Sequence, residues 1–167
     1  KMFWSRGNGW AYAGLALVIA NMPDSDPDKA KFVQVFRQMS AKLKAIQKTD
    51  GYWSPSLLSD PAKALPETSG TGFFVYGMAW GVKAGILDRA TYEPNIRAGW
   101  TALTRAVHPS GKLGWVQLVS DQPNVVNYDD THYYGVGAFL LAATAVSDLG
   151  LKEPRLDDPA SDLISYF

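Results

Sequence analysis

The chain has 167 residues, with 16 basic and 16 acidic side chains and no cysteine. This length allows one domain with a sizeable core, and the zero net charge argues against a nucleic acid or a membrane surface as a partner. Without cysteine the chain can form neither disulfides nor thiolate metal sites, and its apolar runs are too short to span a bilayer.

The first stretch to stand out is Trp4-Ser5-Arg6-Gly7-Asn8-Gly9-Trp10, which an apolar run from Ala11 to Met22 follows at once. We expect residues 4–10 to form a turn that its two glycines make flexible. A guanidinium can bind a carboxylate through two parallel hydrogen bonds, and flat indole faces suit the C–H face of a sugar ring. The stretch therefore predicts a site for an acidic carbohydrate.

Two kinds of helix alternate along the chain. Helices that are apolar on nearly every side, which we predict to be buried all round, are expected at 9–22, 71–87 and 135–149. Helices with one apolar stripe and one polar face are expected at 28–48 and 91–107. The alternation predicts an all-α fold of two concentric layers, in which outer helices wrap inner ones. The only possible strands are short, at 116–119 and 125–126.

A Gly-x-Gly pattern begins each apolar helix. Its first glycines are Gly7, Gly70 and Gly135, which are 63 and then 65 residues apart. A fixed spacing of this kind indicates a structural repeat. Long loops at 49–69 and 108–134 precede the second and third apolar helices, so we expect them to gather at the Gly-x-Gly end, where helix N-termini favour anions. The tail, residues 150–167, is expected to pack on the surface without chemistry.

Five helices make two and a half helical hairpins, and a closed ring of concentric layers needs more. We therefore expect residues 1–167 to be the C-terminal part of a single toroid. The expected partner is the missing N-terminal half, either a removed segment or a separate chain, or else a second copy of this chain, because a half-toroid exposes apolar surface.

The motif at residues 4–10 resembles that of glycoside hydrolase family 105 and the related family 88. The resemblance continues through Asp50-Gly51-Tyr52-Trp53, Glu67-Thr68-Ser69-Gly70-Thr71-Gly72 and Gly135-Val136-Gly137-Ala138-Phe139-Leu140-Leu141. It covers residues 3 to about 149.

This resemblance implies an incomplete (α/α)6 toroid and an enzyme of the unsaturated rhamnogalacturonyl or glucuronyl hydrolase type. Such enzymes remove a 4,5-unsaturated uronic acid from the non-reducing end of pectin- or rhamnogalacturonan-type oligosaccharides. An aspartate acts as general acid/base in hydrating the double bond, with neither metal nor organic cofactor. In the family this aspartate lies upstream of the Trp-x-Arg-Gly-x-x-Trp motif. No catalytic residue is therefore assigned within this chain, and the isolated chain is expected to be inactive.

The candidate substrate residues each have a second interpretation. Arg6 is either a carboxylate clamp or the partner of a loop acid. Trp10 and Trp4 are either sugar platforms or core side chains, and Asn8 either binds a sugar hydroxyl or caps its helix.

The later candidates are equally open. Ser69 and Thr71 either contact substrate or cap the second apolar helix. His132, in an Asp-Asp-x-His sequence, either contacts sugar or makes structural hydrogen bonds, and with one histidine nearby it is a weak metal ligand. Two rival functions also fit the sequence: a non-catalytic carbohydrate-binding helical domain and a purely structural toroid module.

Overall fold

The computed structural model describes residues 3–59 and 65–151, and the regular elements there are all helices. They are α1 (Ser5–Asn21), α2 (Lys29–Ala45), α3 (Thr68–Lys83), α4 (Arg89–Arg105) and α5 (Tyr133–Asp148). Each overlaps one of the five expected ranges, and no end differs from its expected position by more than four residues. The expected surface tail lies, from residue 152 on, outside the described residues.

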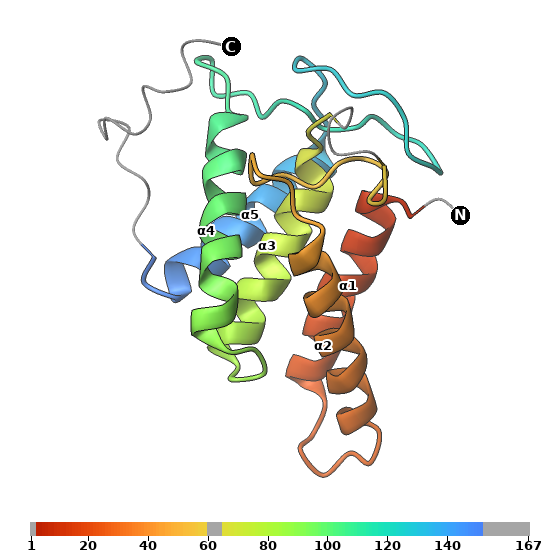
Figure 1. Cartoon of the computed structure of the whole chain (residues 1–167), viewed down its shortest axis with the longest axis vertical. Coiled ribbons are helices and arrows are strands. Elements are labelled where there is room, and N and C mark those ends of the chain that lie inside the picture. Colours follow the sequence, from red (N-terminus) through yellow and green to blue (C-terminus); the bar gives the residue numbers. More distant parts are fainter. Residues whose placement is uncertain (1–2, 60–64, 152–167) are drawn as a thin grey trace.

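The five helices form two layers (Figure 1). Helices α1, α3 and α5 run side by side in one direction, and α2 and α4 return in the opposite direction along one side of them. Helix α3 packs against both α1 and α5 and also against α4, while α2 packs on α1. The predicted inner and outer layers are therefore confirmed for the described part of the chain.

Glycines let the inner helices approach closely. A Cβ atom at Gly72 of α3 would lie 2.8 Å from the carbonyl carbon of Ala138 in α5. A Cβ atom at Gly70 would lie 2.0 Å from the Ser5 hydroxyl oxygen of α1. Both distances are far below van der Waals contact, so these glycines are required by packing rather than by a special backbone conformation.

The prediction that every apolar helix is buried all round is correct for α3 alone. Fourteen of its 16 residues are buried. Helix α1, in contrast, leaves Leu17 52% exposed, and α5 leaves Leu140 58% exposed. The reason is position: α3 has an inner helix on each side, whereas α1 and α5 each have one such neighbour among the described helices. This open apolar surface is what a half-toroid is expected to show.

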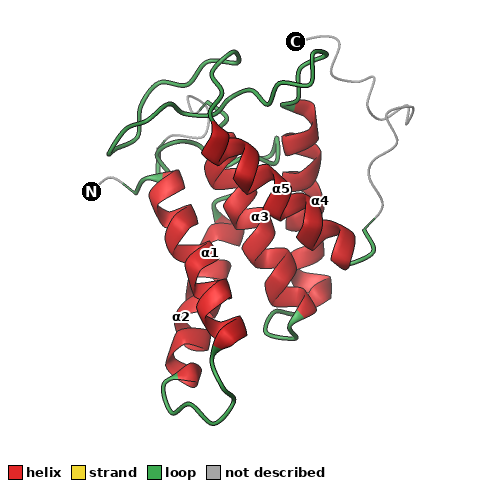
Figure 2. Ribbon diagram, turned by 180° about the vertical axis from the view of Figure 1, so that it is seen from behind, coloured by secondary structure: helices red, strands yellow, loops and turns green. Residues whose placement is uncertain are grey.

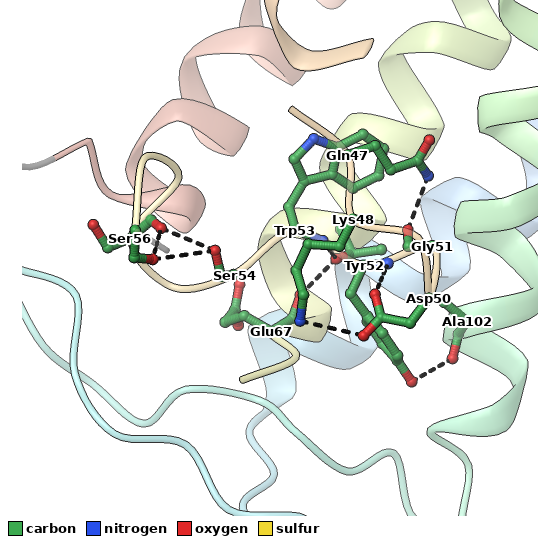
Figure 3. A network of polar contacts seen from close by, with 12 residues as sticks. Gln47, Lys48, Asp50, Gly51, Tyr52, Trp53, Ser54, Ser56, Glu67 and Ala102 are labelled. Carbon is green, nitrogen blue, oxygen red and sulfur yellow. Dashed lines mark hydrogen bonds and ion pairs between the residues drawn. The ribbon is translucent and has the colours of Figure 1, made fainter. Parts of the chain in front are cut away.

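The loop at 47–56 ties three helices together (Figure 3). The Trp53 side chain is completely buried, and its Nε1–H donates to the carbonyl of Leu43 in α2 at 2.9 Å. The Trp53 backbone N–H donates to the Thr71 hydroxyl of α3 at 3.1 Å. The Tyr52 hydroxyl donates to the carbonyl of Ala102 in α4 at 2.6 Å, and burial raises the pKa of this hydroxyl.

The short strands suggested at 116–119 and 125–126 do not form. Both segments lie in the long loop before α5, and Figure 2 shows helices joined by loops throughout the described ranges. The N–H of Val116 donates to the carbonyl of Asp130, but that of Gln117 donates to a side chain, so no ladder develops. Within residues 3–59 and 65–151, no helix is long and apolar enough to cross a membrane.

Candidate functional site

The N-terminal ends of the three inner helices meet at one end of the molecule, as the Gly-x-Gly repeat predicts (Figure 1). We call this end the mouth and define it by Trp4, Arg6, Glu67, Gln117, His132, Tyr133 and Tyr134. Helix α1 or its N-cap supplies the first two residues, the start of α3 supplies Glu67, and the start of α5 supplies the last three. Gln117 comes from the loop between α4 and α5.

The motif at residues 4–10 is helical from Ser5 on, and the expected flexible turn is not present. Trp4 is the N-cap residue, and the Ser5 N–H donates to the carbonyl of Pro55 at 2.8 Å. A Cβ atom at Gly9 would lie 3.0 Å from the Phe73 side chain of α3. Because this contact leaves little room for a side chain, at least this glycine serves helix packing rather than flexibility.

Arg6 is the buried cation of the mouth, with 3% of its surface exposed. One terminal nitrogen donates to the carbonyl of Gln117, and the other donates to that of Leu118 at 2.9 Å. The guanidinium lies 4.7 Å from the ring centroid of Trp4 and 4.3 Å from that of Tyr134. The guanidinium therefore lies against two aromatic rings and binds the 117–118 main chain, a contact that neither interpretation of the sequence included.

Gln117 joins all three inner helices, and no sequence pattern pointed to it. It is 1% exposed. Its side-chain oxygen accepts from the Trp4 indole N–H at 3.1 Å, and its carbonyl accepts from the Tyr134 hydroxyl at 2.6 Å as well as from Arg6. Its backbone N–H donates to a carboxylate oxygen of Glu67 at 3.2 Å.

Glu67 is a completely buried carboxylate at the N-cap of α3. One oxygen accepts from the Ser69 N–H at 3.0 Å and the Ser69 hydroxyl at 2.6 Å, and the other accepts from the Gly70 N–H at 2.7 Å. Burial raises the pKa of Glu67, and the Ser69 and Gly70 hydrogen bonds and the positive charge of Arg6 oppose that rise. In the sequence, Glu67 stands just before an apolar helix and begins the motif Glu67-Thr68-Ser69-Gly70-Thr71-Gly72, but nothing in that pattern predicts its contact with Gln117.

The structure places three of the smaller candidates in structural contacts. Ser69 and Thr71 are completely buried, and neither is the cap, because Glu67 takes that role. The Thr71 hydroxyl donates to the Glu67 carbonyl at 2.6 Å. Asn8 lies inside α1, where its side-chain N–H donates to the carbonyl of Trp4 at 2.8 Å, so it is not the cap either. Their roles toward a substrate stay predictions.

Aromatic rings extend the mouth toward solvent. The His132 ring lies 4.3 Å from the Tyr134 ring and 4.3 Å from the Tyr133 ring, and Tyr133 is 80% exposed. Among the described residues the buried His132 Nδ1 has no hydrogen-bond partner. Trp10 is 54% exposed and packs on Phe73, with 4.4 Å between ring centroids. Trp4, Arg6 and His132 are thus brought together, and Trp10 remains accessible.

In the ranges that the structure describes, no three histidine, aspartate or glutamate side chains lie together as metal ligands would. The acids of the Asp-Asp-x-His sequence serve other contacts. Asp129 pairs with Lys112 at 3.0 Å, and the carboxylate of Asp130 accepts from the backbone N–H of Asn127 at 2.8 Å.

The model of Glycosyl Hydrolase Family 88 matches residues 1–149. The chain belongs to this family. Two curated relatives, from Alteromonas sp. (strain LOR) and Formosa agariphila, are each named unsaturated 3S-rhamnoglycuronyl hydrolase. The first is 41% identical over 143 residues and the second 40% over 149, which is 86% and 89% of this chain. The chain spans only 35% and 40% of the length of these relatives.

Solved structures agree with this assignment. A family 88 glycosyl hydrolase from Bacteroides vulgatus superposes with a TM-score of 0.83 at 38% identity, covering 89% of this chain and 44% of that one. A family 105 glycoside hydrolase from C. acetobutylicum has a TM-score of 0.72 at 22% identity, covering 89% of this chain and 46% of that one. The second likeness shows the fold alone. The five helices of this family 88 chain are therefore a partial match to a larger helical toroid.

Proposed function

We propose that this family 88 chain is part of a hydrolase that removes a 4,5-unsaturated uronic acid from the non-reducing end of an oligosaccharide. The observation that carries the proposal is the 40–41% identity to two relatives named unsaturated 3S-rhamnoglycuronyl hydrolase, over almost all of the described fold. A rhamnose-linked unsaturated uronic acid is accordingly the first substrate to test. Unsaturated pectic fragments, which the motif resemblance implies, are the second.

The proposed reaction adds water across the C4=C5 double bond. A proton goes to C4 and the water oxygen bonds to C5, which gives a hemiketal that opens and releases the sugar. An aspartate outside this chain is proposed as the general acid/base. Residues 1–167 are proposed to supply one wall of the substrate site, and the isolated chain is expected to show no turnover.

The mouth supports the binding of an acidic sugar. Arg6 places a buried positive charge against the rings of Trp4 and Tyr134, and the Trp10 and Tyr133 side chains at the same end of the helices are 54% and 80% exposed. Helix N-termini there add positive potential. Because both terminal nitrogens of Arg6 already donate to carbonyls, gripping the uronate carboxylate requires exchanging at least one of those bonds for a substrate oxygen.

We also propose that further helices of the same toroid cover the open flanks of α1 and α5. These flanks expose Leu17, Val18, Val136 and Leu140, each by 41% or more. Leaving exposed apolar side chains in water is unfavourable, at roughly 25 cal/mol for each Å² of apolar surface. The partial coverage of every relative described above supports the same arrangement.

The test measures loss of the ultraviolet absorbance of the C4=C5 bond in the complete protein, with rhamnose-linked and pectic unsaturated oligosaccharides in parallel. Arg6→Lys keeps the charge but loses the fork, and we expect kcat/KM to fall by about 10- to 150-fold, the equivalent of one charge-assisted hydrogen bond. Arg97→Lys on the outer surface of α4, a half-exposed side chain paired with Glu93, is the matched control. No absorbance loss with either substrate class, or full activity in Arg6→Lys, would contradict the proposal.

A further inference from the structure

The carboxylate of Glu67 makes a contact beyond those of a helix cap. A cap needs one side-chain oxygen to accept from the first turn, and here the Ser69 and Gly70 N–H groups fill that role. Yet the same carboxylate reaches across to the backbone N–H of Gln117, fifty residues further along the chain. A charged group that is 0% exposed is expensive to bury, so its extra contact calls for a physical reason.

The contacts of Gln117 supply that reason. Its N–H is held by Glu67, while its carbonyl receives Arg6 and the Tyr134 hydroxyl and its side chain receives the Trp4 indole. The Glu67 carboxylate thus binds the N–H of Gln117, and the Arg6 guanidinium binds the carbonyl of the same residue. The two opposite charges stabilise each other across this residue, because Arg6 acts on the pKa of Glu67 in the direction that favours the anion.

We propose that Glu67 is a positioning residue of the mouth. It fixes the position of the 115–118 main chain and, through Gln117, the orientation of Arg6 and of the Trp4 and Tyr134 rings. The second anchor of this segment also starts at α3: the Thr68 N–H donates to the carbonyl of Trp115 at 2.9 Å, and the Thr68 hydroxyl to that of Gly114 at 2.9 Å. Thr68 thus fixes the beginning of the segment, and Glu67 fixes its centre, where Arg6 binds.

Glu67→Asp separates positioning from capping. Aspartate keeps the negative charge and is itself a preferred cap, but it is one methylene shorter and cannot hold both Gly70 and Gln117. Asp88→Glu is the matched control, because Asp88 caps α4 through the Thr91 N–H at 2.7 Å at the opposite end of the helices, and it also changes a cap carboxylate by one methylene (Figure 1). Glu67→Gln, which keeps the length and removes the charge, is the second variant.

Two measurements on the complete protein test whether Glu67 positions the 115–118 main chain, and only the second rests on the proposed function. The first is amide hydrogen exchange across residues 115–118, which we expect to quicken by about 10-fold or more in Glu67→Asp and Glu67→Gln and to stay unchanged in Asp88→Glu. The second is turnover of the unsaturated oligosaccharide, where we expect KM to rise about 10-fold with a smaller change in kcat.

The inference would be overturned if Glu67→Asp had the same amide exchange rates and the same KM as the unchanged protein, because helix capping would then account for all of the role of Glu67. Equal effects in Asp88→Glu would overturn it too, because any altered cap would act alike. If Glu67→Gln does not fold, Glu67→Asp decides by the same criteria. A protein that turns over neither substrate class refutes the proposed function, and the exchange rates still decide the role of Glu67.

Discussion

The contact between α1 and α3 at Gly77 offers a sharp test of the inner-layer packing. A Cβ atom there would lie 2.3 Å from Cε1 and 2.6 Å from Cδ1 of Tyr12. The Tyr12 ring cannot move aside easily, because it is completely buried, is stacked on Phe36 at 4.6 Å and is hydrogen-bonded through its hydroxyl to Ser40 at 2.6 Å. Gly77→Ala must therefore displace a helix or break that arrangement.

The expected magnitude is a difference of two terms. Overpacking a filled core costs about 1–3 kcal/mol, whereas replacing a glycine inside a helix by alanine stabilises by about 0.5–1 kcal/mol. Because a clash of 2.3 Å with a held ring places the cost at about 2–3 kcal/mol, the net prediction is that Gly77→Ala lowers the free energy of unfolding by about 1–2.5 kcal/mol, or roughly 2–10 °C in Tm. Gly14→Ala in α1 is the matched control, since no atom lies within 4 Å of its added Cβ, and it should stabilise by about 0.5–1 kcal/mol.

Urea unfolding followed by far-ultraviolet circular dichroism gives both values. Gly77→Ala should have the lower denaturation midpoint and Gly14→Ala the higher one, with similar slopes. If Gly77→Ala proved as stable as Gly14→Ala, the close approach of α1 and α3 at Tyr12 would be refuted.

Three further predictions concern the mouth, its buried acid and the open flanks. Trp10→Ala should leave the free energy of unfolding within about 1 kcal/mol of its original value, because over half of the ring is already in water, yet raise KM for the oligosaccharide about 2- to 12-fold if the ring is a sugar platform. Burial raises the pKa of Glu67, whose ionisable neighbours are Arg6 and Tyr134, so the folded state keeps a proton that the unfolded state releases between the ordinary and the raised pKa. The stability contribution of this group should therefore fall as pH rises through that window. Glu67→Gln should remove this slope from urea midpoints measured at a series of pH values upward from about 4. Sedimentation should find residues 1–167 alone self-associating through the apolar flanks, whereas a stable monomer would count against an uncovered half-toroid.

Local patterns in the sequence were enough to predict the helices and their layers. Apolar periodicity and the Gly-x-Gly repeat predicted five helices, their alternation between layers and the common end of α1, α3 and α5. These features depend on which side chains neighbour one another along a helix, and that information is local. The motifs at residues 4–10 and 67–72 likewise pointed to the family, which the match over residues 1–149 shows.

Contacts between distant segments decided the rest, and no local pattern contains them. Arg6 binds the carbonyls of residues 117 and 118, and Glu67 accepts from the N–H of Gln117. Both contacts depend on where the long loop before α5 lies against the ends of two helices. The expected turn at residues 4–10 is a helix from Ser5 on, and its Gly9 packs closely on Phe73 of a neighbouring helix, a contact that no local pattern contains. Leu17 and Leu140 read as core residues in sequence but are exposed, because burial depends on which helices stand beside α1 and α5. Tertiary placement, which sets burial and charge pairing, therefore decided the chemistry of the mouth.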